Sequence, residues 1–226
     1  GILKPLSAAF ELIADPNGNL LDLSALDDRI RGAEDSGNQF VSSVLSVTRE
    51  YLYYVAGDHA SALQSMDRRV VRIEGSVHET FDYYLQALVS FAEVRDGKPW
   101  VERRRLLKRA RKCMKSLKLL GQNNPASCLA KCMLLEAEEA AINKKYPIAR
   151  ERYANAIALA KSSGSLVEVA LANQAAATHF LQDRHHINSA LDHFKAAREA
   201  YTTWGGHAAV TLLTKRINEL SKHHVQ

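Results

Sequence analysis

The residues of this chain whose types and spacing could do chemistry are concentrated in one basic run. Nine of the 30 lysines and arginines fall in residues 103–118, RRRLLKRARKCMKSLK, while the whole chain has a formal net charge of +5. Residues three or four positions apart share one face of a helix. We therefore predict a basic stripe along such a face, made of Arg104, Lys108, Arg111 and Lys115.

The basic stripe leaves three roles open. It could face solvent, bind an acidic protein partner, or neutralise the phosphates of nucleic acid or of an anionic membrane surface. The run contains no aromatic residue on which a base could stack. Its apolar members would form the inner face of the same helix, and they are Leu106, Leu107, Ala110, Cys113, Met114 and Leu117. This pattern favours a solvated face over a protein partner, and a protein partner over nucleic acid or lipid.

Cysteines and histidines provide weaker candidates for chemistry. Cys128 and Cys132 are four residues apart, but a tetrahedral metal site needs two further ligands and no histidine lies nearby in the sequence. His78 followed by Glu79 resembles the start of a histidine-kinase phosphoacceptor box, yet residues 80–82 lack its proline. We expect buried thiols and structural or solvated histidines, with no metal site.

Sequence motifs of enzymes are missing from the chain. We find no G-x-x-x-x-G-K-[ST] phosphate loop, no G-x-G-x-x-G fingerprint, no H-E-x-x-H pair and no G-x-S-x-G elbow. The sequence therefore predicts a protein that is not an enzyme, has no catalytic residue and requires no cofactor.

The composition indicates which elements must position these residues. Eleven glycines and five prolines in 226 residues are few for the turns of a β-sandwich or barrel, so we predict an all-α fold. Three cysteines, an odd number, argue against a disulfide framework and are consistent with a reducing compartment. No apolar run reaches the length of a membrane span, and the first residues do not resemble a signal peptide. We expect a cytoplasmic location and no membrane insertion.

Glycine and proline also suggest the domain organisation. Residues 1–37 are interrupted often enough to predict a leader with short helices, whereas residues 38–226 contain long runs separated by short breaks. We expect one helical repeat domain over 38–226, with Gly121 and Gly205 ending two of its helices.

A repeat of small, aromatic and small residues recurs along the second half of the chain. Ala149, Tyr153 and Ala156 align with Ala190, Phe194 and Ala197 at a shift of 41 residues. Looser copies are Leu106, Ala110, Cys113 and Ala62, Met66, Arg69. The spacing places each trio on one helix face, where small residues let a neighbouring helix approach. We predict a right-handed superhelical stack of tetratricopeptide-like antiparallel helix hairpins.

The first helix of each hairpin in such a stack usually lines its concave side. The repeat offset then predicts a partner-binding groove formed by Tyr51, Tyr54, Phe91, Arg95, Lys131, Glu138 and His179.

Four sequence stretches resemble one family of proteins. They are YLYYVAGDHASAL from Tyr51, YANAIALAKSSG from Tyr153, ALAN at 170–173 and AYTTWGGHAAV ending at Val210. This string is similar to the helical-repeat region of very large signalling proteins that join a serine/threonine-kinase-like domain, an AAA-type ATPase, a GAF sensor and a histidine kinase. The resemblance covers about residues 39–220 and implies a regulatory connector without catalytic residues. The basic run and the leader have no counterpart in it.

These observations predict a non-catalytic scaffold for protein–protein interactions, or a regulatory connector of a signal-transduction kinase in a two-component system. Its partners would be another protein or other domains of the same polypeptide. The alternative is a helical module that binds a polyanion, either nucleic acid or anionic lipid, through the stripe in residues 103–118.

Overall fold

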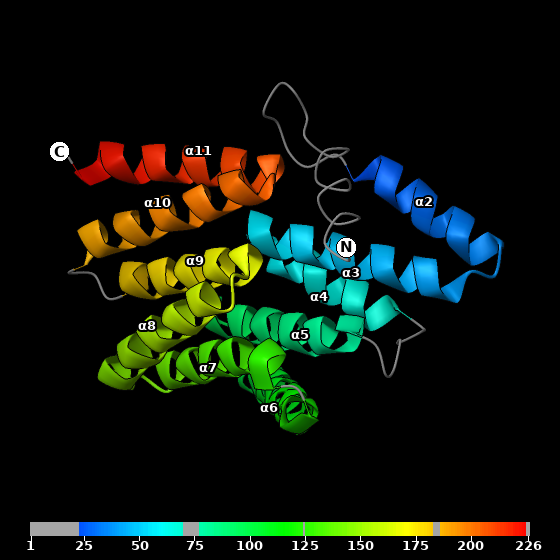
Figure 1. Ribbon diagram of the computed structural model, residues 1–226, viewed down its shortest axis with the longest axis horizontal. Helices are drawn as coiled ribbons and strands as arrows, with labels where there is room; N and C mark the ends of the chain where they lie inside the picture. The colour runs from blue at the N-terminus through cyan, green and yellow to red at the C-terminus, as the bar shows by residue number, and fades with distance from the viewer. Residues whose placement is uncertain (1–22, 70–76, 124, 183–185, 225–226) are drawn as a thin grey trace. The chain divides into compact units, whose positions relative to one another are not determined.

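The computed structural model of the protein describes residues 23–69, 77–123, 125–182 and 186–224. Within these ranges all regular secondary structure is α-helical, and no strand occurs (Figure 1). The predicted all-α fold of stacked helix hairpins is therefore confirmed. The right-handed superhelix stays a prediction.

The chain divides into two compact units, residues 1–123 and 124–226. The described helices of the first unit are α2 (Ser24–Asp35), α3 (Gln39–Ala56), α4 (His59–Arg68), α5 (Val77–Arg95) and α6 (Trp100–Asn123). Consecutive helices pack on one another throughout this unit, and α3 also contacts α5. Its largest fully buried side chains include Tyr51, Tyr84, Phe91 and Leu117.

The described helices of the second unit are α7 (Pro125–Ile142), α8 (Tyr146–Ser162), α9 (Leu166–Gln182), α10 (Ile187–Trp204) and α11 (His207–His224). Helix α9 packs closely on α10 because much of it is alanine. Tyr153, Phe194 and Tyr201 are the largest side chains of this unit that are almost completely buried.

The repeat positions lie where the spacing predicts. The trios fall on the second helices of the hairpins, in α4, α6, α8 and α10, with Arg69 directly after the end of α4. All of their apolar members are buried, from Ala62 and Met66 to Phe194 and Ala197. Arg69 is the one charged residue among the four trios. Its side chain is buried and pairs with Glu50 and Asp82.

The predicted domain boundaries differ from the observed ones. Helix α2 begins at Ser24 and packs on α3, so the second half of the predicted leader belongs to the first compact unit. Residues 1–22, where we also expected short helices, lie outside the described residues. The predicted domain 38–226 is divided after residue 123, because the contacts cluster on either side of that position.

One of the two predicted helix ends is wrong. Gly205 ends α10 in the left-handed conformation, with φ of 90°, as expected. Helix α6 instead continues through Gly121 to Asn123. A single glycine inside a helix costs only about 1 kcal/mol, which the burial of Leu117 one turn earlier can offset.

None of the described helices is long and apolar enough to cross a lipid bilayer.

Candidate partner-binding surface

Helix α6 carries the basic run and is positioned by its apolar inner face. It starts after Pro99, whose carbonyl oxygen accepts a hydrogen bond from the backbone N–H of Arg103 at 2.8 Å. Leu106, Ala110 and Leu117 are almost fully buried along the side that packs on α5. This spacing of four and seven residues turns the remaining positions of α6 outward.

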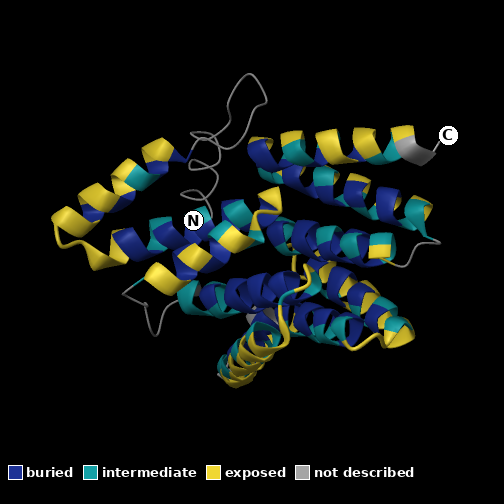
Figure 2. Cartoon of the chain, turned by 180° about the vertical axis from the view of Figure 1, so that it is seen from behind, coloured by how far each residue is buried: buried dark blue, intermediate teal, exposed yellow. Residues whose placement is uncertain are grey.

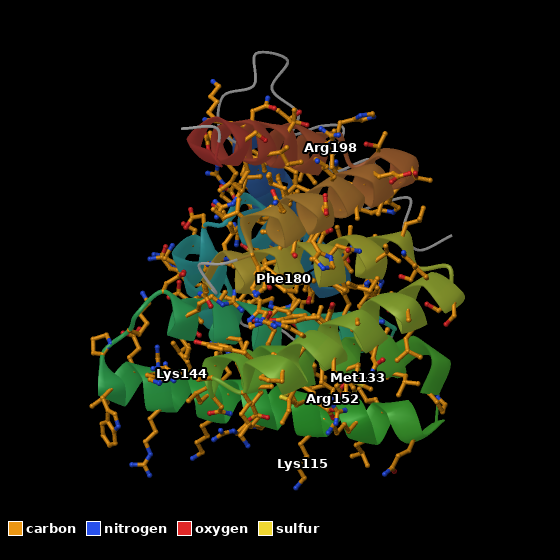
Figure 3. The ribbon with its side chains drawn as sticks, turned by 90° about the vertical axis from the view of Figure 1, so that its left-hand side faces the viewer. Lys115, Met133, Lys144, Arg152, Phe180 and Arg198 are labelled. Atoms are coloured by element: carbon orange, nitrogen blue, oxygen red, sulfur yellow. The ribbon has the colours of Figure 1, made fainter. Side chains whose placement is uncertain are left out.

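The predicted basic stripe lies on the outward side. Arg104, Lys108, Arg111 and Lys115 are all exposed. Figure 2 shows α6, the lowest helix in that view, exposed along most of one side. In Figure 3 the side chain of Lys115 extends away from the helices.

An exposed tryptophan extends the stripe at its N-terminal end. Trp100 is 69% exposed, and the guanidinium carbon of Arg104 lies 5.6 Å from the centre of its ring. Such an arrangement is a cation–π contact. Trp100 precedes Arg104 by four residues, so the helical spacing that predicts the stripe would have included it. Trp100 lies outside the run 103–118 from which the stripe was predicted, so it was missed.

A shallow hollow follows this face of α6. Its volume is about 380 Å³, and it is lined by Trp100, Arg103, Arg104, Leu107, Lys108 and Arg111. An indole ring, an aliphatic side chain and four cations therefore face the same space. An amphipathic acidic ligand could bury apolar groups against Trp100 and Leu107 while pairing its carboxylates with the cations.

Some cations of the run are already engaged within the first unit. Arg109 donates to Asp67 at 2.5 Å, and it also lies 3.5 Å from the side-chain oxygen of Gln86. Arg105 lies 3.9 Å from Glu102 on the same helix. Within the described part of the chain, no acidic side chain pairs with Lys108 or Lys115. These two stripe lysines are therefore available to an external anion.

The predicted groove is not an open surface. The structure buries Tyr51, Tyr54, Phe91, Lys131, Glu138 and His179, and only Arg95 is partly exposed. The prediction that these residues face a groove is thus wrong for six of the seven, because the first helix of each hairpin is packed inside its unit.

Specific partners explain this burial. The Tyr51 ring lies 5.7 Å from that of Phe81, and Tyr153 donates a hydrogen bond to Glu138 at 2.6 Å. Lys131 forms an ion pair with Glu168 across α7 and α9. Large rings bury apolar area, and pairing offsets part of the desolvation cost of the two charged groups. The aromatic and charged residue types led us to predict a binding groove. In the structure these side chains instead pack the helices of the hairpins together.

A buried charged cluster in the first unit is the strongest perturbed titratable site. Glu50 has no exposed surface, and its Oε1 lies 3.5 Å from Nε of Arg69 and accepts from Ser65 at 3.3 Å. Burial raises the pKa of Glu50 from 4.5 to about 7, against the opposing effect of Arg69. Such a pKa would suit acid–base catalysis. A carboxylate with no exposed surface cannot touch a substrate, so we interpret the cluster as structural.

Comparisons with family models, with curated proteins and with solved structures found no match to this chain. The interpretation of its surface therefore depends on the geometry of α6.

Proposed function

We propose that this protein is a non-catalytic scaffold for protein–protein interactions that binds an acidic, amphipathic protein segment on the outer face of α6. The observation that carries this proposal is the hollow in which Trp100 and Leu107 lie beside the cations of the stripe. Tryptophan and arginine are the residue types that most often dominate the binding energy of protein interfaces.

Apolar exposure on α6 distinguishes this face from an ordinary solvated one. Val101 is 74% exposed and Leu119 is 64% exposed, in addition to Trp100. One exposed apolar residue is ordinary on a protein surface, whereas three on the outer side of a single helix form a larger apolar surface. The positive charges select an acidic partner and accelerate its association, while the apolar residues supply most of the affinity.

The alternative function is binding of a polyanion, either nucleic acid or anionic lipid. The same exposed stripe favours it, because each phosphate that Lys108 or Arg104 neutralises would release counterions. A platform for single-stranded nucleic acid usually offers several aromatic rings in succession, and Trp100 is the one aromatic residue of α6. This composition supports the protein partner over the nucleic acid.

The role of regulatory connector in a larger signalling kinase belongs to the same proposal. Its support is the resemblance of the sequence to the helical-repeat region of such proteins, together with the hairpin stack on which those repeats would be built. In that case the acidic segment would come from another domain of the same polypeptide.

Fluorescence titration can test the α6 surface directly, because the chain has only two tryptophans. In a Trp204→Phe variant, Trp100 alone reports binding. The probes are a 20-residue peptide of alternating glutamate and leucine pairs, a 20-nucleotide single-stranded DNA and vesicles containing phosphatidylserine. At physiological salt we expect the peptide to bind at least about tenfold more tightly than the DNA or the vesicles.

Charge reversal supplies the matched comparison. Replacing Arg104, Lys108, Arg111 and Lys115 by glutamate should abolish peptide binding, whereas the same reversal at four exposed lysines of the second unit, Lys161, Lys195, Lys215 and Lys222, should leave it within about twofold. Tighter binding of DNA than of peptide, lost in the same α6 variant, would establish the polyanion function instead. Equal effects of the two reversals would show that only net charge matters and would refute the α6 site.

A further inference from the structure

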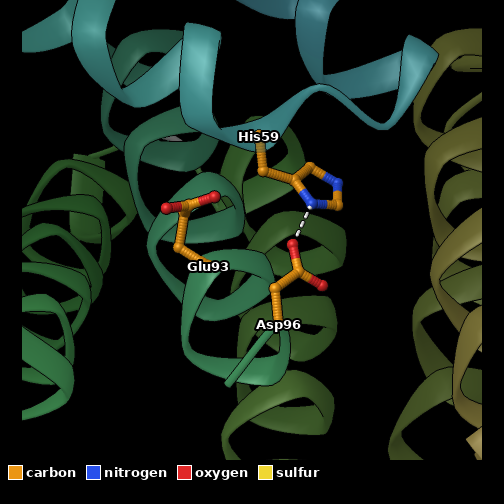
Figure 4. A group of neighbouring side chains, drawn as sticks. All are labelled: His59, Glu93 and Asp96. Carbon is orange, nitrogen blue, oxygen red and sulfur yellow. Dashed lines mark hydrogen bonds and ion pairs between the residues drawn. The ribbon is translucent and has the colours of Figure 1, made fainter. Parts of the chain in front are cut away.

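Three potential metal ligands meet where the start of α4 approaches the end of α5. A ligand atom of each of His59, Glu93 and Asp96 lies within 4.8 Å of the corresponding atoms of the other two (Figure 4). Nδ1 of His59 lies 2.8 Å from Oδ2 of Asp96. No metal site was predicted from the sequence, because His59 is distant in the chain from Glu93 and Asp96 and no recognisable ligand motif joins the three.

Local structure holds each of the three residues in place. Helix α3 ends at Gly57, and the Asp58 side chain caps α4 by accepting from the backbone N–H of Ser61 at 3.0 Å, so His59 is the first residue of α4. The His59 ring also lies 5.5 Å from that of Tyr54. Glu93 lies in the last turn of α5. Asp96 directly follows that helix and donates its backbone N–H to Ala92 at 3.0 Å.

The exposure of the three side chains differs in a way that suits cation binding. The Glu93 side chain is 3% exposed, whereas those of His59 and Asp96 are 18% and 49% exposed. A buried carboxylate needs a positive partner, and the two outer groups leave an entry path from solvent.

A lysine provides that positive partner in this structure. Nζ of Lys98 lies 2.9 Å from Oε2 of Glu93. The buried Glu93 carboxylate is therefore already paired with a cation at this position. The Lys98 side chain is partly exposed and can leave it without unfolding either helix.

We propose that His59, Glu93 and Asp96 form a zinc site that competes with Lys98 for the buried Glu93 carboxylate. One imidazole and two carboxylates are ligands that Zn²⁺ accepts at about 2.0–2.2 Å, with a fourth position left for water. Ligand atoms on one tetrahedral zinc are about 3.4 Å apart. The three ligand atoms lie within 4.8 Å of one another in this structure, so binding one zinc ion requires side-chain movements of about 1 Å. The neutral imidazole also favours zinc over Mg²⁺ or Ca²⁺, which prefer oxygen ligands alone.

Zinc bound in this way would clamp the α3–α4 turn to the end of α5. The ligands come from the start of α4 and the end of α5, which lie together at one end of the hairpin that these two helices form. Because the unfolded chain does not hold the three ligands together, binding of zinc would stabilise the folded state.

Competition of the 226-residue protein with a chromophoric chelator for Zn²⁺ at pH 7.4 tests the site. All proteins in the series carry His185→Ala and His223→Ala, so that neither adjacent histidine pair of the sequence can chelate the metal. We expect one zinc per chain, with a dissociation constant in the micromolar range or below. His59→Ala and Glu93→Gln should each weaken binding at least about tenfold. Mg²⁺ at millimolar concentration should not displace the zinc.

The decisive variant is Lys98→Ala, which should tighten zinc binding by at least about fivefold because it removes the competing cation. His207→Ala, at an exposed histidine of α11, is the matched control and should bind zinc as the parent does. Circular dichroism establishes that each variant is folded, and zinc should raise the Tm of the parent but not that of His59→Ala. Zinc binding that His59→Ala leaves unchanged, or that Lys98→Ala fails to tighten, overturns the proposal.

Discussion

Glu50 shows how a single buried residue couples the stability of the first unit to pH. Its carboxyl faces Arg69, Asp82, Ser65 and Arg49, which belong to α3, α4 and α5 or directly follow α4. Desolvation is the largest effect on it, and the two arginines only partly compensate. The folded protein therefore binds a proton at Glu50 more tightly than the unfolded chain does.

We predict that this residue makes the protein less stable as pH rises. The pKa of Glu50 is about 7 in the folded protein, compared with the ordinary value of 4.5 expected for the unfolded chain. The contribution of Glu50 to stability is therefore complete below pH 4.5 and is lost as the pH rises to about 7. The loss is on the order of 3 kcal/mol. Urea unfolding between pH 5 and pH 8 should show this slope in the parent and a flatter profile in Glu50→Gln.

The exposed carboxylate variant Glu219→Gln is the control for this experiment and should follow the parent profile. A Glu50→Gln profile as steep as that of the parent would mean that other groups cause the pH dependence.

At the scale of elements, glycine is required at the end of one helix and unfavourable inside another. Gly57 ends α3 with φ of 82°, in the left-handed region that residues with a Cβ rarely adopt. Gly32 lies within α2, is exposed, and has open space where a Cβ would be. The first glycine is required by the turn, and the second only weakens its helix.

The same substitution should therefore have opposite signs at these positions. We predict that Gly57→Ala lowers the free energy of unfolding by about 1 kcal/mol, through backbone strain. Gly32→Ala should raise it by about 0.5–1 kcal/mol, through better helix propensity. Chemical denaturation of both variants measures the two effects. A stabilising Gly57→Ala would contradict the left-handed end of α3.

At the scale of the whole molecule, the chain divides into two compact units. The buried residues of the second unit include Leu135, Tyr153, Leu171, Phe194 and Leu213. Neighbouring hairpins in a helical stack contribute most of one another's stability, so a unit with two complete hairpins and a closing helix has what it needs to fold.

We predict that residues 124–226 fold on their own. The fragment should give a helical circular dichroism spectrum and a cooperative thermal transition. Phe194→Ala in the same fragment should cost about 3–5 kcal/mol, because it empties a site that is almost completely buried. A fragment that remains unfolded, while the full chain is folded, would show that the core of this unit depends on residues 1–123.

Local patterns in the sequence were sufficient to predict the helical fold and the exposure of the basic stripe. Small and aromatic residues at spacings of four and three positions predicted the buried faces of α4, α6, α8 and α10. The same periodicity predicted that Arg104 and Lys115 are exposed. These features follow from the 3.6-residue turn of the helix, which any stretch of sequence specifies by itself.

Only the tertiary structure decided what the first helices of the hairpins do and where a metal could bind. Tyr51 and Glu138 are residue types that occur both in grooves and in cores, and their burial depends on which helices pack against them. His59 and Glu93 meet because α4 packs on α5, a contact between residues distant in the chain. Side-chain periodicity specifies the face of a helix, whereas the partner of that face is specified by the packing of the whole unit.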